Sequence, residues 1–574
     1  MIDMFAFSRK RVGLDLDDLT ARGLASGLIG RFQASTESVI VIASVFWTLA
    51  ANRMFFNASL RTEAAGGFSW ALAIDLMVIV TALHVLVLGL LCTRRTLKPV
   101  LVLLALVAAA SMHFMQAFGV VLDPSMLRNA WQTHPAEAGE LLSWRLALDL
   151  LLYAGLPSAL LMGVRTPPRP RRTALAARAG LLGLALLLGV GGLIWQYKPL
   201  AALMRNHKEL RYLVTPANSL WSFGAVLAAD LRGAAQPRLE IGLDAAPGPS
   251  WVQQTRPRLV VVVVGETVRA ANWGLNGYAR QTTPRLAGLP IVNFPLASAC
   301  GSSTAVLLPC MFAPVGRRDY DEARIRGSQS LLHVVARAGV SVTWRDNQAG
   351  CKGVCDGLPT EQVSAASAPG LCKGDQCFDE GLLNGLDQRL AQAATGRGNQ
   401  LLVLHMLGNH GPAYYRRYPA AFERFKPACR EDDLARCSQQ EIVNAYDNAV
   451  LYTDHVLATL IGTLQAQSGQ VDSAVVYLSD HGESLGEKGL FLHGLPMAIA
   501  PREQTRIPIA MWSSEGFDRQ ANLDRACLQR RSALPVQHDH LFHTVLGLLD
   551  VTTALYVPTL DVTAGCRPMP TAAH

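Results

Sequence analysis

The stretch PRLVVVVVGETVRAANWGLNGY, residues 257–278, decides the fold of the second half of this 574-residue chain. Six aliphatic residues, 259–264, follow one another without a polar interruption, which is typical of a parallel strand buried on both faces. Glu266 follows this run after one glycine, at the position where open α/β sheets place ligand-binding groups. The pattern therefore predicts an α/β domain with a functional group at one edge of its sheet.

Two further apolar runs end in polar motifs of the same kind. Residues 401–406 lead into GNHGP, and residues 474–479 lead into DHGES. Helical patterns at 328–338, 378–393 and 442–465 separate the runs. Strands that alternate with helices predict an α/β sandwich around a mostly parallel sheet.

The three strand ends carry side chains of the kind that bind metals. Four of these side chains should meet at the same edge of the sheet, and a fifth follows in LFLHGLP: Glu266, His410, Asp480, His481 and His493. Carboxylates and imidazoles are oxygen and nitrogen ligands that zinc accepts. An Asp-His pair alone is more often a turn or cap, but three converging motifs predict a metal site.

The segment LASACGSSTAVLLPCMF, from Leu296, offers a nucleophile. Ser302, Ser303 and Thr304 lie in a turn of small residues that two cysteines enclose. A hydroxyl bound to zinc loses its proton more readily than a free one, so it can attack phosphorus near neutral pH. The same cluster is also typical of a helix N-cap, and one turn can serve both purposes.

Apolar residues are concentrated in the first 200 positions and predict membrane-spanning helices, each of which needs about 20 mostly apolar residues. Three of the candidate windows lack Asp, Glu, Lys and Arg altogether. The first and fourth are shorter, and a buried or interfacial helix is the alternative for those two. The five windows are 38–52, 76–93, 99–122, 150–164 and 179–197.

Basic residues alternate between the loops and so predict the orientation, because Lys and Arg resist translocation. The basic segments should face the cytoplasm, and after five crossings the C-terminal part should lie outside. We expect no cleavable secretory signal, because the chain opens with a stretch of more than 30 residues that contains many polar and charged side chains, rather than with a short basic region followed at once by an apolar core. The basic residues are Arg9, Lys10, Arg11, Arg22 and Arg31; Arg94, Arg95 and Lys98; and Arg165, Arg169, Arg171, Arg172 and Arg178. The loops after the first and third windows are poorer in them, with Arg53, Arg61 and Arg128.

Cysteine usage supports this topology independently. Ten of the 11 cysteines fall between Cys300 and Cys566, several at short spacing, which indicates disulfides formed in an oxidising compartment. Zinc knuckles are the alternative, but the irregular spacing lacks a partner pair for each. The expected pairs are Cys300–Cys310, Cys351–Cys355, Cys372–Cys377 and Cys429–Cys437, with Cys527–Cys566 assigned by elimination.

These observations predict three parts: a transmembrane domain at 1–198, a bridge at 199–250 and a catalytic domain at 251–574. The first half of the bridge, from Met204, mixes cations with Tyr and Trp, as helices at the headgroup level do. The second half is rich in proline and glycine and predicts a linker. The net charge of +8 lies mostly in the cytoplasmic loops, so it implies no nucleic-acid partner.

Four motifs carry a resemblance to a known family. GETVRAANWGLNGYARQTTPRL, CGSSTAVLLPCMF, HMLGNHGPAYYRRYP and LSDHGESLGEKGLFLHGLP resemble the lipid A phosphoethanolamine transferases, which include the mobile colistin-resistance enzymes. FGVVLDPSMLRNAWQTHPAEAGELL and RNHKELRY are similar as well, so the resemblance extends from the third window to Arg567. It implies an alkaline phosphatase/sulfatase-like catalytic domain.

The resemblance implies specific roles for the strand-end residues. Thr304 matches the zinc-bound nucleophile of the family, and the remaining ligands of that zinc match Glu266, Asp480 and His481. His410 and His493 match a pair near the substrate, implicated in binding a second zinc or in proton transfer.

The resemblance also implies a phosphoethanolamine pocket. Asn129, Thr133, Glu137 and Lys352 match positions that line it, together with His410 and His493. The family often has a serine where this chain has Ala349, so one headgroup contact would have to come from Ser303 or from a main-chain group.

The implied reaction is a double displacement, because one nucleophile serves a donor and then an acceptor. Thr304 would take phosphoethanolamine from phosphatidylethanolamine, releasing diacylglycerol, and a lipid A phosphate would then accept the group. One zinc, or two, would neutralise developing charge, and His410 or His493 would protonate the leaving glycerol oxygen. The enzyme would be a monomer in the inner membrane of a Gram-negative bacterium, with its catalytic domain in the periplasm, and would confer polymyxin resistance.

Three alternatives remain at this point. The acceptor could be a core sugar or another glycan instead of lipid A. A phosphoglycerol transferase or sulfatase would share the fold, the metal and the nucleophile, and only the residues around Asn129 and Glu137 argue against it. An inactive sensor or scaffold on the same fold is the third class, but every ligand and nucleophile position is filled.

Overall fold

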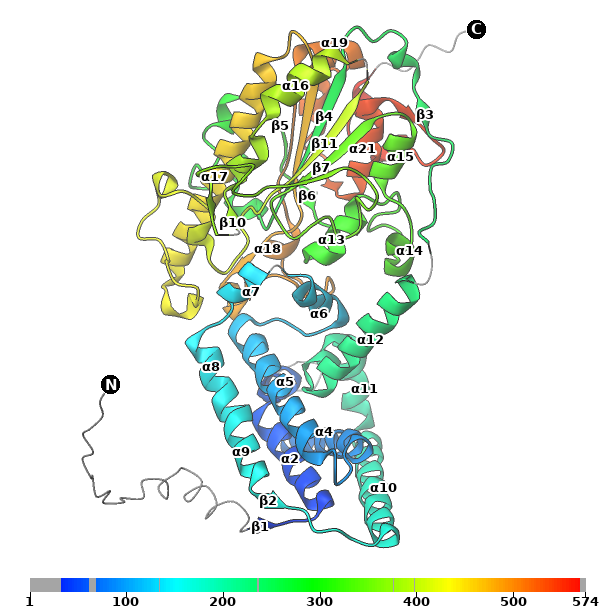
Figure 1. Ribbon diagram of the computed structural model, residues 1–574, viewed down its shortest axis with the longest axis vertical. Helices are drawn as coiled ribbons and strands as arrows, with labels where there is room; N and C mark the ends of the chain where they lie inside the picture. The colour runs from blue at the N-terminus through cyan, green and yellow to red at the C-terminus, as the bar shows by residue number, and fades with distance from the viewer. Residues whose placement is uncertain are drawn as a thin grey trace, which may run out of the picture. The chain divides into compact units, whose positions relative to one another are not determined.

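The computed structural model describes residues 32–60, 69–133, 135–234, 237–374, 376–396 and 398–567 (Figure 1). These residues pack into two compact units. The first comprises residues up to 112 with 148–210 and 214–217, and the second comprises 113–147, 211–213 and 218 onward. The basic residues Arg9, Lys10, Arg11, Arg22, Arg31 and Arg61, on which part of the orientation argument rests, lie outside the described residues.

Long apolar helices dominate the first unit. Four of the described helical stretches are long and apolar enough to span a membrane: Trp70–Leu91 (α4), Leu97–Phe118 (α5), Trp144–Met162 and Arg171–Trp195 (α10). The first predicted window falls on Thr36–Ala50 (α2), which is too short alone but is followed by Arg53–Leu60 (α3) at a bend of 56°. The count is therefore four, or up to five if the bent pair is one span, and five crossings stay a prediction.

The stretch Trp144–Met162 is continuous but not uniformly α-helical. Trp144–Leu150 (α8) and Leu156–Met162 (α9) are joined by a π-helical turn, Leu151–Gly155 (η3). Pro157 has no N–H to continue the regular hydrogen-bond ladder, and a widened turn is one way in which a helix absorbs that defect.

Small residues allow the helices of the first unit to pack closely. A Cβ on Gly192 of α10 would lie 2.5 Å from the Asp75 carboxylate of α4, and one on Gly89 would lie 2.6 Å from Leu182. Helix association in membranes depends on such close backbone approach. The two glycines therefore explain why α4 and α10 lie against each other.

The second unit is built around a seven-stranded sheet, with the order β5-β15-β12-β4-β11-β7-β8. The sheet is mixed: four neighbouring pairs are parallel, and the two pairs that involve β15 are antiparallel. The three predicted strands form its centre. The strands are Val292–Phe294 (β5), Ile509–Ser513 (β15), Asp472–Ser479 (β12), Arg258–Gly265 (β4), Gln400–His405 (β11), Ser341–Asp346 (β7) and Thr360–Gln362 (β8).

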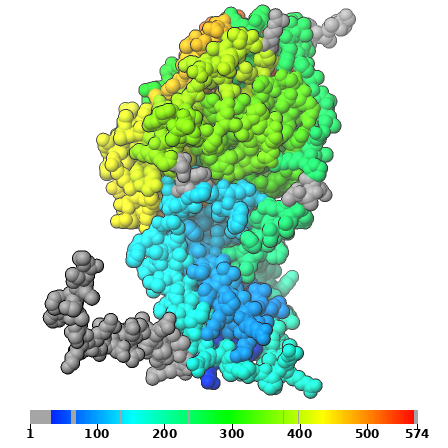
Figure 2. All heavy atoms as spheres, viewed as in Figure 1, coloured from blue at the N-terminus to red at the C-terminus, as the bar shows by residue number. Residues whose placement is uncertain are grey.

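Helices cover both faces of this sheet, and every residue of β4 and β12 is buried. Alternate residues of β4 enter two separate cores, because successive side chains of a strand point to opposite faces. One core includes Leu331–Arg337 (α15) and Asp539–Leu549 (α21), and the other includes Leu386–Thr395 (α16) and Gln439–Ala466 (α17). The central strand β4, which the ribbon shows, accordingly lies beneath the surface atoms of the space-filling view (Figure 2).

The structure contains all five predicted disulfides: Cys300–Cys310, Cys351–Cys355, Cys372–Cys377, Cys429–Cys437 and Cys527–Cys566. Each lies in the second unit, and four of them close loops of ten residues or fewer. Cys92, the remaining cysteine, is buried at the end of α4 with a free thiol.

The predicted bridge is more ordered than its composition indicates. Its first half contains Tyr197–Asn206 (α11), a 3₁₀ turn at Lys208–Leu213 (η4) and Ala217–Ala234 (α12). In its proline-rich half, Ala246–Pro247 (β3) pairs with Val551–Thr552 (β17). The loop after the third predicted window forms Pro124–Trp131 (α6) and Pro135–Glu140 (α7) and packs within the second unit.

Candidate active site

The register of the central strands brings the first two candidate ligands together. β4 and β12 run parallel with Gly265 opposite Ser479, so the next residues, Glu266 and Asp480, leave the sheet side by side. The main-chain N–H of Thr267 donates to Oδ1 of Asp480 at 3.0 Å and ties the two strand ends together. The predicted convergence at this edge of the sheet is therefore present.

The Thr304 hydroxyl lies close to three other side chains that can bind a metal, those of Glu266, Asp480 and His481. Its Oγ1 is 2.9 Å from Oδ2 of Asp480, 3.2 Å from Oε2 of Glu266 and 3.3 Å from Nε2 of His481. Nε2 of His481 is 3.2 Å from Asp480 and 3.4 Å from Glu266. A tetrahedral zinc with ligand distances of about 2.0–2.1 Å has ligand–ligand edges of about 3.3–3.4 Å, so the spacing of these donors fits one ion.

The orientation of His481 also fits a ligand. Its Nδ1 lies 2.8 Å from the carbonyl oxygen of Gly482, which can only accept a hydrogen bond. Nδ1 therefore carries a proton, and Nε2 faces the other three donors of the cluster. A main-chain carbonyl that fixes the ring in this way is a common feature of metal-binding histidines.

The two buried carboxylates of the cluster favour the binding of a cation. Glu266 and Asp480 are fully buried, and burial together with the charge of Glu266 raises the pKa of Asp480 to about 6. Burial opposes ionisation of His481 as well, but the two carboxylates raise its pKa to about 10. In the absence of a metal a proton on His481 balances the carboxylates, and a bound metal ion would take over that role.

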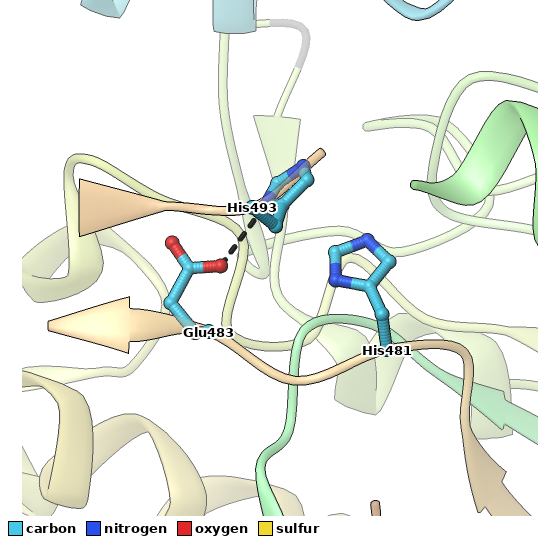
Figure 3. Close-up of side chains that lie close together, drawn as sticks. All are labelled: His481, Glu483 and His493. Atoms are coloured by element: carbon cyan, nitrogen blue, oxygen red, sulfur yellow. Dashed lines mark hydrogen bonds and ion pairs between the residues drawn. The ribbon is translucent and has the colours of Figure 1, made fainter. Parts of the chain in front are cut away.

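A second group of possible ligands adjoins the first. Nδ1 of His493 lies 2.9 Å from Oε2 of Glu483, and the Tyr414 hydroxyl donates to Oε1 of the same carboxylate at 2.7 Å. The ring of His493 is 4.1 Å from that of His481 and 5.7 Å from that of His410, measured between centroids. Figure 3 shows the Glu483 carboxylate directed toward His493, with His481 beside them. Donor atoms of His481, Glu483 and His493 are close enough together to hold one ion.

The helix α7 reaches this second group. Oε2 of Glu137 lies 3.7 Å from Nε2 of His410, so one predicted pocket residue meets one predicted catalytic residue. Glu140, on the same helix, forms a fully buried ion pair with Arg417, whose Nε donates to the carbonyl of His410 at 2.6 Å. These contacts hold the His410 loop against α7.

The other predicted pocket residues, Asn129, Thr133 and Lys352, form a separate group, which we call the headgroup wall. Lys352 donates to the carbonyls of Gln132 and Ala349, at 3.0 and 2.8 Å, and Thr133 donates to the carbonyl of Asn129 at 2.8 Å. Burial lowers the pKa of Lys352, against the opposing charge of Glu137. Thr133 and Ala349 line a cavity of about 760 Å³.

The three hydroxyls of the nucleophile turn differ in their surroundings. Thr304 is the first residue of Thr304–Met311 (α13) and is the one that reaches the carboxylates. Ser302 donates to the carbonyl of Leu495 instead. Ser303 stands at the N-cap position but makes no capping bond with its side chain. The geometry therefore favours Thr304 as the nucleophile among the three hydroxyls. The side chain of Ser303 makes no N-cap hydrogen bond.

Several side chains in the site were not singled out from the sequence. Thr267 donates to Oε1 of Glu266 at 2.7 Å, and the Gln348 amide donates to Oε2 at 3.2 Å. Glu483 bonds to His493, and Tyr414 bonds to Glu483, as described above. Glu483 lies two residues after His481 in DHGES, and this proximity was a usable signal, whereas nothing in the sequence around Gln348 marks it.

The chain is similar to known proteins along nearly its whole length. The family model described as phosphoethanolamine transferase EptA/EptB matches residues 80–231, and the sulfatase model matches residues 258–551. Phosphoethanolamine transferase EptA of Salmonella typhimurium is 39% identical, over 80% of this chain and 84% of that protein. Phosphatidylethanolamine transferase Mcr-1 of Escherichia coli is 36% identical, over 91% of this chain and 96% of that one.

A solved structure is similar over both units. The integral membrane protein lipooligosaccharide phosphoethanolamine transferase A of Neisseria meningitidis matches with a TM-score of 0.88 and 36% identity, covering 94% of this chain and all of that one. The fold and the buried donor cluster define a membrane-associated enzyme with a sulfatase-like domain. With these similarities, the chain belongs to the phosphoethanolamine transferase family and is a transferase.

Proposed function

We propose that this enzyme transfers phosphoethanolamine from phosphatidylethanolamine to a phosphate of lipid A, through a covalent intermediate on Thr304. The observation that carries the proposal is the position of the Thr304 hydroxyl, 2.9 Å from Asp480 and 3.3 Å from His481. Such a hydroxyl, buried among three metal-type ligands, is arranged for nucleophilic attack.

Zinc is the metal whose ligands these side chains match, and the proposed ligands are Glu266, Thr304, Asp480 and His481. When bound, it would supply charge neutralisation at the transferring group and a lower pKa for the threonine hydroxyl. A possible second zinc is proposed on the substrate side, at the pair His410 and His493, whose ring centroids are 5.7 Å apart.

The chain's own residues would carry the two displacements. The Thr304 oxygen bonds to phosphorus, the bond from phosphorus to the glycerol oxygen breaks, and diacylglycerol leaves with a proton. His493, whose Nδ1 is held by Glu483, or His410 beside it, would provide that proton. An oxygen of the acceptor phosphate then attacks the same phosphorus and regenerates the threonine.

The phosphoethanolamine headgroup would lie between α7 and the headgroup wall that contains Lys352. Glu137 supplies a buried carboxylate for the ammonium of the donor, and Lys352 supplies a cation for its phosphate. Asn129 and Thr133 would complete the pocket beside the cavity that Ala349 lines. His410, which faces Glu137 at 3.7 Å, connects this pocket to the metal ligands.

A core sugar is the second candidate acceptor. One relative is named Kdo(2)-lipid A phosphoethanolamine 7''-transferase, and it is 26% identical over 80% of this chain, compared with 39% for the Salmonella typhimurium EptA. The relative named for the sugar acceptor is thus the less similar of the two, and we propose a lipid A phosphate from the family resemblance of the motifs. Transfer to that phosphate would reduce the negative charge of the outer surface and weaken binding of polymyxins.

Mass spectrometry tests the proposal directly. Lipid A from a host that expresses this chain should gain phosphoethanolamine on a phosphate, and modification found only on the core would support the sugar acceptor. Purified enzyme incubated with phosphatidylethanolamine and no acceptor should carry phosphoethanolamine on the peptide that contains Thr304. The label on Ser302 or Ser303 instead would contradict the assignment.

We further propose that residues 1–198 span the inner membrane five times, that 199–250 form the bridge, and that 251–574 lie in the periplasm. We expect a monomer with lipid substrates and no nucleic-acid partner. A reporter fused after His574 should be active in the periplasm, and one fused near Arg171 in the cytoplasm. The reverse pattern would mean that one of the predicted spans does not cross.

A further inference from the structure

The first turn of α13 contains a main-chain carbonyl that its own helix cannot satisfy. In an α-helix the carbonyl of one residue accepts the N–H of the residue four positions later, and four positions after Ala305 stands Pro309. Proline has no N–H, so the carbonyl of Ala305 lacks the donor that an α-helix supplies four positions later. Ala305 is fully buried and directly follows Thr304, so the missing bond lies beside the proposed nucleophile.

Arg326 supplies a donor in its place. Its guanidinium donates from Nη2 to the carbonyl of Ala305, and from Nε to Glu322 at 2.9 Å. Arg326 ends the short helix Glu322–Arg326 (α14), which packs against α13. A planar guanidinium can hold two acceptors in fixed directions, as it does here with a carboxylate and a main-chain carbonyl.

The same carboxylate leads to the proposed headgroup pocket. Oε1 of Glu322 lies 3.6 Å from Nε of Arg128, which is buried on α6 and also pairs with Asp230 of α12. Arg128 precedes Asn129, and α6 itself packs against α13. One carboxylate therefore joins the guanidinium that holds the Thr304 turn to the helix that carries a pocket residue.

We propose that Arg326 is a positioning residue for the transfer reaction: it holds the carbonyl of Ala305 and thereby fixes the direction of the Thr304 hydroxyl. The inference rests on the proposed function, because it takes Thr304 as the nucleophile. A misplacement of about 1 Å at a reacting group can cost roughly 100-fold in rate. Other side chains bind the donor, so the loss of Arg326 should affect kcat more than KM.

The first test compares two arginines of α14 in the full-length enzyme, purified in detergent and assayed with phosphatidylethanolamine and lipid A. Arg326→Gln should lower kcat roughly ten- to a hundredfold, with the donor KM within about twofold of the original. Arg324→Gln is the matched control, because Arg324 is exposed and pairs with Asp319 at the surface. Equal kcat values for the two variants would overturn the proposal.

A rescue experiment separates positioning from general stabilisation. Pro309→Ala restores an N–H four residues after Ala305, so it should recover most of the kcat lost in Arg326→Gln. Alone, Pro309→Ala should change kcat little, because Arg326 already binds the carbonyl. A double variant that melts like the parent enzyme yet stays as slow as Arg326→Gln would refute the role of the Ala305 carbonyl.

Two further variants keep the outcomes distinguishable. If Arg326→Gln does not fold, the same rescue is measured in Arg326→Lys, which keeps the charge but loses the forked geometry. Thr304→Ala separates the two hypotheses. Transfer by Thr304→Ala would refute the proposed nucleophile, whereas its loss of activity beside normal turnover by Arg326→Gln would refute only the role of Arg326.

Discussion

The metal-ligand cluster and the headgroup wall lie in the same unit but are built differently. Glu266, Asp480 and His481 follow the ends of paired central strands, whose register fixes their separation. Lys352 and Thr133 lie in loops, where main-chain carbonyls hold their side chains. Under the proposed function, the chemical step would depend on the sheet, whereas recognition of the donor would depend on loops.

Among the substitutions that test this difference, replacement of the nucleophile should lower kcat the most. Thr304→Ala should lower kcat by at least about 10³-fold, since loss of an attacking group removes the covalent route. The folded fraction should be unchanged, because the substitution removes one small side chain at the start of α13. Thr304→Ser should keep part of the activity, and Ser302→Ala and Ser303→Ala should keep most of it. Activity assays beside melting curves would check this order.

Metal removal should abolish activity as completely but reversibly. Chelation by EDTA should stop transfer, and zinc should restore it better than magnesium, because the donor set combines an imidazole with oxygen ligands. Metal analysis of the purified enzyme gives the number of bound ions. Full activity of metal-stripped enzyme would contradict the assignment of the cluster.

Substitutions of two glutamates of α7 should separate an effect on donor binding from an effect on stability. Glu137→Gln removes the carboxylate that faces His410 and should raise the donor KM roughly tenfold. Glu140→Gln breaks the buried pair with Arg417 and should cost about 3–5 kcal/mol of stability. Donor titrations and thermal melts on both variants test this division, and identical profiles would argue against separate roles.

A smaller effect is expected from the disulfide around the nucleophile turn. Replacing both Cys300 and Cys310 by Ser should cost about 2–4 kcal/mol of stability and should also lower turnover, because the bond closes the turn that carries Thr304. Cys429–Cys437 closes a loop of similar length and is the matched control. Its removal should cost similar stability at normal turnover, measured at low temperature.

The strand-end ligands could be predicted from the sequence because burial leaves a clear pattern. An unbroken apolar run such as 259–264 indicates both the strand and the point at which it ends. The edge strand β5 and its neighbour β15 could not be predicted in this way. They are three and five residues long and each contains a polar residue, and so short a segment does not distinguish a parallel from an antiparallel neighbour.

The residues of the headgroup pocket could be predicted only from the resemblance to a known family. Glu137 lies on the six-residue helix α7 and Lys352 in a loop, and neither segment is long enough to show a periodic pattern. Their contacts depend on tertiary packing that local sequence does not encode. Gln348 was missed for the same reason, since its amide reaches Glu266 from a turn after β7. The bend of 56° between α2 and α3 explains why the first predicted span is short.

The pairing of β4 with β12 has a consequence for biogenesis. Glu266 and Asp480 are 214 positions apart in the chain, and they become neighbours only when these two strands lie in register. A chain that has crossed the membrane but has not completed its sheet therefore offers no assembled site for an ion. Metal binding would then be a late step of folding, and only a chain with a complete sheet would hold the ion that the proposed reaction requires.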